Sequence, residues 1–187
     1  ALSLIALLLL NFGIEAKINI AASEEKQVLC QEIYKKMINE HFFNDKDLTS
    51  INSEIFDALV DQLDSQKIYF TENEMASFKR KFSRFDDPIS YQKKYLKSSF
   101  CSIYLKSQFA FMNLYFNRLI EATNYQLKEV SRKNFDFTKE EIILIDNDQK
   151  KWQKSKFALK KVWRKLAKND VLTSILADKE LDEATET

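Results

Sequence analysis

Apolar residues recur at helical spacing along most of this chain, and short polar stretches separate the runs. After Ser23, which can cap a helix, apolar residues return every four or five positions in one stripe: Leu29, Ile33, Met37 and Phe42. A second run follows an i, i+4, i+8 face: Ile51, Ile55, Phe56, Leu59, Val60 and Leu63. The polar pair Asp64-Ser65 ends it. Each run predicts one amphipathic helix.

The start of a third helix is marked by side chains on both sides of Thr71. Thr71 and Glu74 have the spacing of a capping box, and Phe70 can contact Met75 as a hydrophobic staple. Apolar residues then recur at Met75, Phe78, Phe82 and Phe85. We expect this helix to stop at Asp86-Asp87-Pro88, because proline disfavours helical backbone in the residue before it and suits the first position of a following helix.

A run without helix breakers extends from Pro88 to about Arg132 and predicts one long helix or two nearly collinear ones. Aromatic residues widen its apolar arc: Tyr95, Phe100, Tyr104, Phe109, Phe111, Tyr115 and Phe116. Several neighbouring helices must cover so wide an arc. Lysines and an arginine are threaded through it, so a role in a protein core is favoured over a role in a membrane.

The capping pattern recurs after the long helix. Residues 134–137 read as a short connection, and Thr138 with Glu141 repeats the capping box. Phe137 and Ile142 repeat the staple. A helix is therefore predicted to begin near Thr138.

Two more helices are predicted towards the end of the chain. One covers about Lys154 to Lys168, with an apolar face that includes Trp163. The other starts in Val171–Leu176 and has little to bury. It ends in mid-pattern at Thr187, and we interpret this as truncation of a longer domain.

Glycine and proline are almost missing, with one of each in 187 residues: Gly13 and Pro88. Any left-handed turn beyond Gly13 is expected to fall on residues such as asparagine. Phosphate-binding loops, dinucleotide fingerprints, nucleophile elbows and tight hairpins depend on residues that tolerate positive φ, so these elements are excluded. The predicted fold class is all-α, a multi-helix array with one long central helix.

The charge balance gives little support for a nucleic-acid partner. Lys and Arg number 29 and Asp and Glu 28, and the two signs are interspersed. Phosphate binding needs a concentrated positive face, which this pattern does not predict.

The amino terminus has the pattern of an export signal. Ala1–Leu10 is an almost continuous apolar run, shorter than the ~20 residues that a membrane-spanning helix needs. Small residues offer cleavage after Ala16, or later at Ala21-Ala22. We therefore interpret residues 1–16 as a signal peptide without its basic start, and residues 17–187 as the exported domain. An uncleaved anchor or an ordinary buried helix is the alternative.

Two cysteines, Cys30 and Cys101, lie on separate predicted helices. Export would place them in an oxidising compartment, where thiols can pair. A disulfide between them is an open alternative, but two buried free thiols are favoured, because the sequence does not supply the Cα separation that a bond requires.

No catalytic, cofactor-binding or metal-ligating residue is predicted in this chain. His41 is the only histidine, so a multi-histidine metal site is excluded, and the residue reads as a surface position at a helix end. Four carboxylates read as turn or cap residues: Asp45, Asp47, Asp86 and Asp87. Asp146 and Asp148 form only a fragment of a calcium loop, whose glycine is absent. A Ser-Lys pair is disfavoured, since helix interiors have no free amides to stabilise an oxyanion.

Several segments resemble those of bacterial tail-specific proteases, also called carboxy-terminal processing proteases. Leu63-Asp64, Lys67 and Tyr69-Phe70 resemble the family's L-D-x-x-K-x-Y-F segment, and the stretch from His41 to Leu63 resembles the helix before it. The segment 135–138 resembles the D-F-T connection that follows the family's long helix. Residues 163–170 resemble the W-R-K-x-x-K-N-D helix. The resemblance covers most of the chain from Glu25 onwards.

The resemblance implies a periplasmic serine endopeptidase that recognises apolar protein carboxy-termini through a PDZ domain and a Ser-Lys pair. The matching region is scaffold in that family and supports the protease core and the substrate-holding bowl. The implied partners are downstream PDZ and protease domains, protein substrates with apolar carboxy-termini and an adaptor lipoprotein, with no cofactor. The alternatives are a freestanding periplasmic helical binding module that has lost the protease, and an all-helical effector or nucleic-acid binder.

Overall fold

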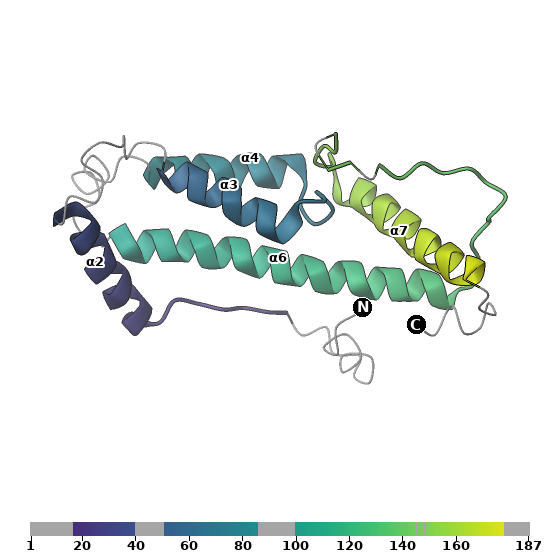
Figure 1. Cartoon of the computed structure of the whole chain (residues 1–187). Coiled ribbons are helices and arrows are strands. Elements are labelled where there is room, and N and C mark those ends of the chain that lie inside the picture. Colours follow the sequence, from purple (N-terminus) through teal and green to yellow (C-terminus); the bar gives the residue numbers. More distant parts are fainter. Residues whose placement is uncertain (1–16, 40–50, 86–99, 145, 148, 178–187) are drawn as a thin grey trace. The chain divides into compact units, whose positions relative to one another are not determined.

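The computed structural model describes residues 17–39, 51–85, 100–144, 146–147 and 149–177, and in these the chain is all-α (Figure 1). The described helices are α2 Glu24–Asn39, α3 Ile51–Asp64, α4 Glu72–Phe82, the 3-10 turn η1 Ser83–Phe85, α6 Phe100–Ser131 and α7 Lys156–Leu176. No β-strand occurs in the described residues, where Thr71 and Gln153 form an isolated parallel bridge. The predicted fold class is confirmed, and the predicted long helix is confirmed over residues 100–131. Residues 88–99 of that prediction lie outside the described residues.

The chain divides into two compact units, each with its own set of contacts. Unit 1 consists of residues 1–18, 66–71 and 116–187, and unit 2 of residues 19–65 and 72–115. The long helix α6 contributes its first half to unit 2 and its second half to unit 1.

Unit 2 is organised around a cluster of phenylalanine rings. Phe56 of α3 stacks on Phe82 of α4 with ring centroids 4.4 Å apart, and it meets Phe111 of α6 edge to face at 5.1 Å. Phe78 contacts the same Phe111 ring at 5.1 Å. All four side chains are buried. Such edge and offset pairs add about 0.5 to 1.5 kcal/mol each beyond simple burial, and here they join α3 and α4 to α6.

The borders of α3 and α4 agree well with the sequence pattern. α3 ends at Asp64, as the polar break predicts, and α4 begins directly after Thr71. The regular α-helix stops at Phe82, and the chain tightens into η1, which still buries Phe85. Ile55 is a correction to the predicted face of α3, because this side chain is 46% exposed. The predicted stop at Asp86-Asp87-Pro88 lies outside the described residues.

Helix α2 is capped as predicted, but two residues of its predicted apolar stripe are exposed. The Ser23 Oγ accepts a hydrogen bond from the Lys26 N–H at 3.3 Å. Leu29 and Ile33, which the pattern places on the stripe, are 54% and 50% exposed. Phe42 lies outside the described residues. These two side chains therefore contribute little apolar burial to α2.

A covalent bond ties α2 to α6. Cys30 and Cys101 form a disulfide with their Cα atoms 5.8 Å apart, so the prediction of two free thiols is wrong. The separation lies within the usual range for disulfides, and it depends on how two helices far apart in the sequence pack together. Cys101 is buried and Cys30 is half-buried.

Unit 1 pairs α7 with the second half of α6. Trp163 and Leu159 of α7 pack with Ala122 of α6 in a buried cluster, and Tyr69 and Tyr125 cover its edge. The Tyr125 and Trp163 rings lie 6.0 Å apart. Small Ala122 facing a large indole lets the two helices approach closely.

Helix α7 starts later and runs further than the pattern predicts. Ser155 is its N-cap, and the Ser155 Oγ accepts a hydrogen bond from the Ala158 N–H at 3.2 Å. The helix continues through residues 171–176, so the prediction of a separate helix start there is wrong. Val171 is buried, and its burial explains why the helix continues through this stretch.

The helix predicted to begin near Thr138 does not form. Residues 138–144 are not helical, and the two staple residues Phe137 and Ile142 are 38% and 81% exposed. The Thr138 N–H and Oγ1 donate instead to the Asp136 carboxylate at 3.0 Å and 2.6 Å. The Glu141 Oε2 accepts a hydrogen bond from Lys168 of α7 at 2.8 Å. These contacts, with the β-branched isoleucines that follow, favour an extended connection.

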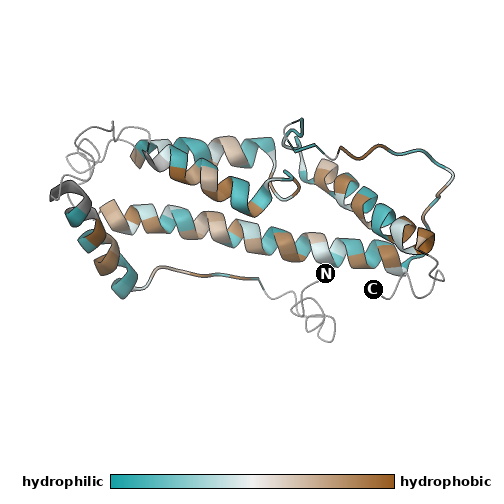
Figure 2. Cartoon of the chain, viewed as in Figure 1, coloured by the Kyte–Doolittle hydropathy of each residue, from teal (hydrophilic) through white to brown (hydrophobic). Residues whose placement is uncertain are grey.

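Among the described residues, no helix is long and apolar enough to cross a membrane. Figure 2 shows apolar and polar residues mixed along α6. The apolar run at residues 1–16 lies outside the described residues, so its interpretation as a signal peptide stays a prediction.

Candidate functional site

Parts of three segments that carry the family resemblance lie within unit 1. We call this part of unit 1 the motif junction. It consists of residues 66–71, 116–144, 146–147 and 149–170, which include the second half of α6 and most of α7. The motif carboxylate Asp64 lies in unit 2, where it is buried at the end of α3. Burial, and after it the charge of Asp64, raises the pKa of Tyr115.

Lys67 fastens the turn after α3 to the connection that precedes α7. Its Nζ donates to the carbonyl oxygens of Lys150 at 2.7 Å and Asn147 at 3.3 Å. The backbone of Lys67 is left-handed, with φ of 55°, as is that of Lys133, with φ of 48°. The expectation that asparagine would take such positions is therefore wrong for the described residues. The left-handed region costs an ordinary residue about 1 to 2 kcal/mol, which the two ammonium contacts help to offset at Lys67.

Trp163 holds the same turn from α7. Its side chain is 1% exposed, and the indole Nε1–H donates to the carbonyl oxygen of Ile68 at 2.7 Å. A buried indole needs such an acceptor, because an unmet donor costs about 1 to 3 kcal/mol. Trp152 adds an edge contact to Phe70 with ring centroids 6.2 Å apart.

Arg118 holds the turn from α6. Its guanidinium is buried, donates from Nη1 to the carbonyl oxygen of Tyr69 at 3.2 Å, and lies 3.3 Å from Glu121 at the Nε atom. The Lys67 side chain and the backbone carbonyls of Ile68 and Tyr69 thus contact three different parts of unit 1. The turn is fixed from the connection, from α7 and from α6.

A network of ion pairs and hydrogen bonds links α6, residues 139–141 and α7. Arg164 lies 3.6 Å from both Glu129 and Glu141, and Glu129 also contacts Arg132 at 2.8 Å. Lys168, which is buried, donates to Glu141 at 2.8 Å and to the carbonyl oxygen of Lys139 at 3.0 Å. A buried ammonium without partners would be strongly destabilising, and these contacts give Lys168 its partners.

Two carboxylates of this region have lowered pKa values. The hydrogen bond from Lys168, followed by the charges of Lys168 and Arg164, lowers the pKa of Glu141. Hydrogen bonds from the Thr138 side chain and backbone lower the pKa of Asp136. Both groups are therefore stabilised as carboxylates, the form that accepts these bonds and not the form of a general acid.

The chemistry of the motif junction is that of a structural network. Its cations donate to carboxylates and backbone carbonyls, and its indole donates to a carbonyl. Within the part of the chain that the structure describes, no group of three or more His, Cys, Asp or Glu residues could hold a metal ion.

The structure places few of the side chains singled out in the sequence. Asp146 is exposed and accepts a hydrogen bond from Gln149 at 2.9 Å. The others lie outside the described residues: His41, Asp45, Asp47, Asp86, Asp87 and Asp148.

Sequence reasoning missed the buried charges Arg118, Glu129 and Lys168. Each reads as an ordinary polar residue on an amphipathic helix, because the pattern does not reveal which polar positions a neighbouring segment covers. The one local signal was the i, i+3 spacing of Arg118 with Glu121 and of Glu129 with Arg132.

Fold and site together define an all-helical domain whose distinctive side chains hold its own segments together. The family model described as "Tail specific protease N-terminal domain" matches residues 33–187, and the chain belongs to this family. A search of curated proteins finds no match. The family resemblance seen in the sequence is thereby confirmed.

Proposed function

We propose that this chain is the non-catalytic helical scaffold of a periplasmic serine endopeptidase that processes or degrades proteins from their carboxy-termini. The observation that carries the proposal is the use of the family motifs in the motif junction. Lys67, Arg118 and Trp163 all hold one turn by hydrogen bonds to backbone carbonyls. Side chains used in this way stabilise a platform on which other domains can be mounted.

The periplasmic setting is supported by the cysteine chemistry. The Cys30–Cys101 disulfide suits an oxidising compartment, and such bonds are rare in a reducing cytosol. The apolar run Ala1–Leu10 followed by small residues suits export to that compartment. Fractionation of cells that produce the chain from its own gene tests this point. Recovery in the periplasmic fraction supports it, and recovery in the cytosol contradicts it.

The scaffold role predicts that this chain does not hydrolyse peptides by itself. The experiment incubates the purified chain with a reporter peptide that has an apolar carboxy-terminus and follows cleavage by mass spectrometry. A mock purification from cells without the gene controls for contaminating proteases. No cleavage beyond the mock level is expected, and cleavage that co-purifies with the chain would overturn the scaffold role.

The gene sequence after Thr187 tests the proposed partners. An open frame that continues into a PDZ and protease region would supply the catalytic serine and lysine that the resemblance implies. A stop codon directly after Thr187 would contradict the proposal and support a freestanding binding module.

A further inference from the structure

Two asparagines of α6 hold the backbone of an extended segment at residues 17–20 (Figure 1). The Asn117 Oδ1 accepts from the Ile18 N–H at 2.9 Å, and the Asn117 Nδ2 donates to the Ile18 carbonyl at 2.7 Å. The Asn113 Oδ1 accepts from the Ile20 N–H at 2.7 Å, and the Asn113 Nδ2 donates to the Ile20 carbonyl at 2.8 Å. Asn113 Nδ2 also lies 3.4 Å from the Asn19 side-chain oxygen.

The spacing of the two carboxamides matches the repeat of an extended chain. Four residues of α-helix rise about 6 Å. Two residues of extended chain rise about 6.5 Å. Asn113 and Asn117 therefore meet every second residue of a segment that runs opposite to α6. A carboxamide carries both a donor and an acceptor, so it pairs with a peptide group as a neighbouring strand would.

The contacts use groups that almost every amino acid carries. The side chains of Lys17, Asn19 and Ile20 are exposed, and that of Ile18 is half-buried. Four of the five hydrogen bonds are made to backbone N–H and carbonyl groups. Only proline lacks the N–H that each asparagine needs.

We propose that Asn113 and Asn117 form a binding strip for extended polypeptide, read through its backbone, and that residues 17–20 are its tethered occupant. This inference rests on the proposed function, because a protease that takes proteins from their ends receives them in extended form. The strip accepts segments of varied sequence, and a competing segment displaces residues 17–20 to bind.

The two possible cleavage positions have opposite consequences for the strip. Cleavage after Ala16 leaves residues 17–20 attached at the new amino terminus, where they occupy the strip. Cleavage after Ala22 removes them and leaves the strip open to another polypeptide. Mass determination of the mature amino terminus distinguishes the two forms.

The first experiment measures amide hydrogen exchange in the full chain. Slow exchange is expected at the Ile18 and Ile20 amides, because each N–H donates a hydrogen bond to an asparagine Oδ1. The double variant Asn113→Leu, Asn117→Leu keeps good helix formers on α6 and should exchange these amides at the rate of an unprotected peptide. Asn124→Leu, at an exposed position of the same helix, is the matched control and should keep the protection. Unprotected amides in the unaltered chain would overturn the proposal.

The second experiment tests whether the strip binds a separate polypeptide. The double variant Ile18→Pro, Ile20→Pro disables the tethered occupant, and Ile18→Val, Ile20→Val keeps its N–H groups as a control. The probe is a fluorescein-labelled peptide with the sequence of residues 16–23. By fluorescence anisotropy, the proline variant should bind this peptide on the order of tenfold tighter than the valine control, because the apparent Kd falls as the open fraction of the strip rises.

Two altered peptides test whether the backbone is what the strip reads. A peptide with valine at both isoleucine positions should bind equally well, and one with proline there should not bind. Adding Asn113→Leu and Asn117→Leu to the proline variant should abolish binding. If the proline variant fails to bind the first peptide, the contacts are only an intramolecular clamp and the proposal is overturned. Because no cleavage is measured, this failure is distinct from failure of the scaffold role.

Discussion

At the scale of single residues, Trp163 combines packing with one hydrogen bond, and the two contributions can be separated. The indole is buried against Leu159 and Ala122, and its Nε1–H reaches the Ile68 carbonyl at 2.7 Å. Removing the ring loses both contributions, whereas phenylalanine keeps most of the packing and loses only the donor.

Trp163→Ala should lower the free energy of unfolding by about 3 to 5 kcal/mol, because it leaves a large cavity between α6 and α7. Trp163→Phe should lower the free energy of unfolding by less, about 1 to 3 kcal/mol, because the hydrogen bond from the indole to the Ile68 carbonyl is lost. Phe157→Ala is the matched control: that ring lies on the same helix, is 68% exposed and should change stability by no more than about 0.5 kcal/mol. Urea denaturation measures all three, and equal effects for Trp163→Ala and Phe157→Ala would show that the buried cluster is misassigned.

The ionisation of Glu141 makes the stability of the chain depend on pH. Its pKa in the folded chain lies below the ordinary value of 4.5, chiefly because Lys168 donates to it. Folding therefore favours the carboxylate, and the stability that it contributes is present above about pH 4.5 and lost as the pH falls through the lower folded pKa.

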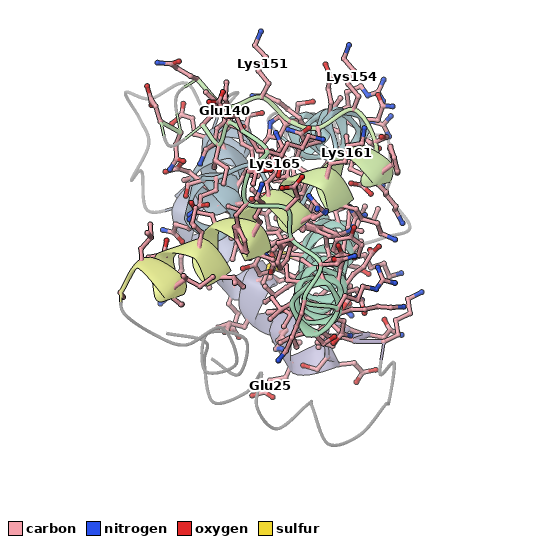
Figure 3. The ribbon with its side chains drawn as sticks, turned by 90° about the vertical axis from the view of Figure 1, so that its right-hand side faces the viewer. Glu25, Glu140, Lys151, Lys154, Lys161 and Lys165 are labelled. Carbon is pink, nitrogen blue, oxygen red and sulfur yellow. A yellow bond between two sulfur atoms is a disulfide. The ribbon has the colours of Figure 1, made fainter. Side chains whose placement is uncertain are left out.

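Glu141→Gln should therefore lower the melting temperature at pH 7, and the difference from the unaltered chain should shrink at pH 3. Glu140→Gln, at the exposed neighbouring position labelled in Figure 3, is the control and should leave the melting curve unchanged at both values. Calorimetry at the two pH values checks this. A difference that stays constant with pH would mean that the bond from Lys168 does not govern the ionisation of Glu141.

At the scale of elements, the disulfide ties α2 to α6. Val28 and Leu29 of α2 are each 54% exposed, so burial of these two side chains contributes little free energy to hold the helix. The bond between Cys30 and Cys101 closes a loop with a sequence separation of 71 residues. In the chain-entropy model, a loop of this size stabilises the folded state by on the order of 4 kcal/mol.

Reduction of the disulfide should speed hydrogen exchange throughout α2 and leave α7 unchanged. The double variant Cys30→Ser, Cys101→Ser should behave like the reduced chain. Thiol titration of the denatured, unreduced chain is the direct check and should find no free thiol. Two free thiols in a chain prepared from an oxidising compartment would show that the disulfide does not form. Hydrogen exchange in α2 that stays the same after reduction would show that the disulfide does not hold this helix.

The sequence pattern predicts most helices because their apolar spacing and their capping residues are set by neighbours in the sequence. α3 ends at Asp64, α4 starts after Thr71, and α6 keeps its helical spacing up to Ser131. The false start at Thr138 shows the limit of such patterns. A capping box is only a spacing of side chains, and Glu141 is taken instead by Lys168 of a helix that follows later in the chain.

The motif junction could be predicted only in part. The sequence pointed to the segments that carry the resemblance and to Trp163 as a core residue. It did not reveal that Lys67 adopts a left-handed backbone or that Arg118 and Lys168 are buried, because these features depend on segments that are distant in sequence. The disulfide was missed for the same reason, since the distance between Cys30 and Cys101 is set by how α2 packs on α6.

At the scale of the whole molecule, polar side chains hold the connections between helices in place. In unit 1, the turn at residues 66–71 accepts hydrogen bonds from α6 and α7, and its Lys67 donates to backbone carbonyls of residues 147 and 150. The central claim is that the motif residues act by holding this turn and not by contacting a substrate.

The most direct test of that claim compares Lys67→Met with Lys151→Met in urea denaturation of the full chain. Both substitutions remove one ammonium, but Lys67 donates to two carbonyls whereas Lys151 is exposed and projects outward (Figure 3). Lys67→Met should lower the free energy of unfolding by about 1 to 3 kcal/mol. Lys151→Met should change it by no more than about 0.5 kcal/mol. Equal unfolding curves for the two variants would show that Lys67 does not hold the turn.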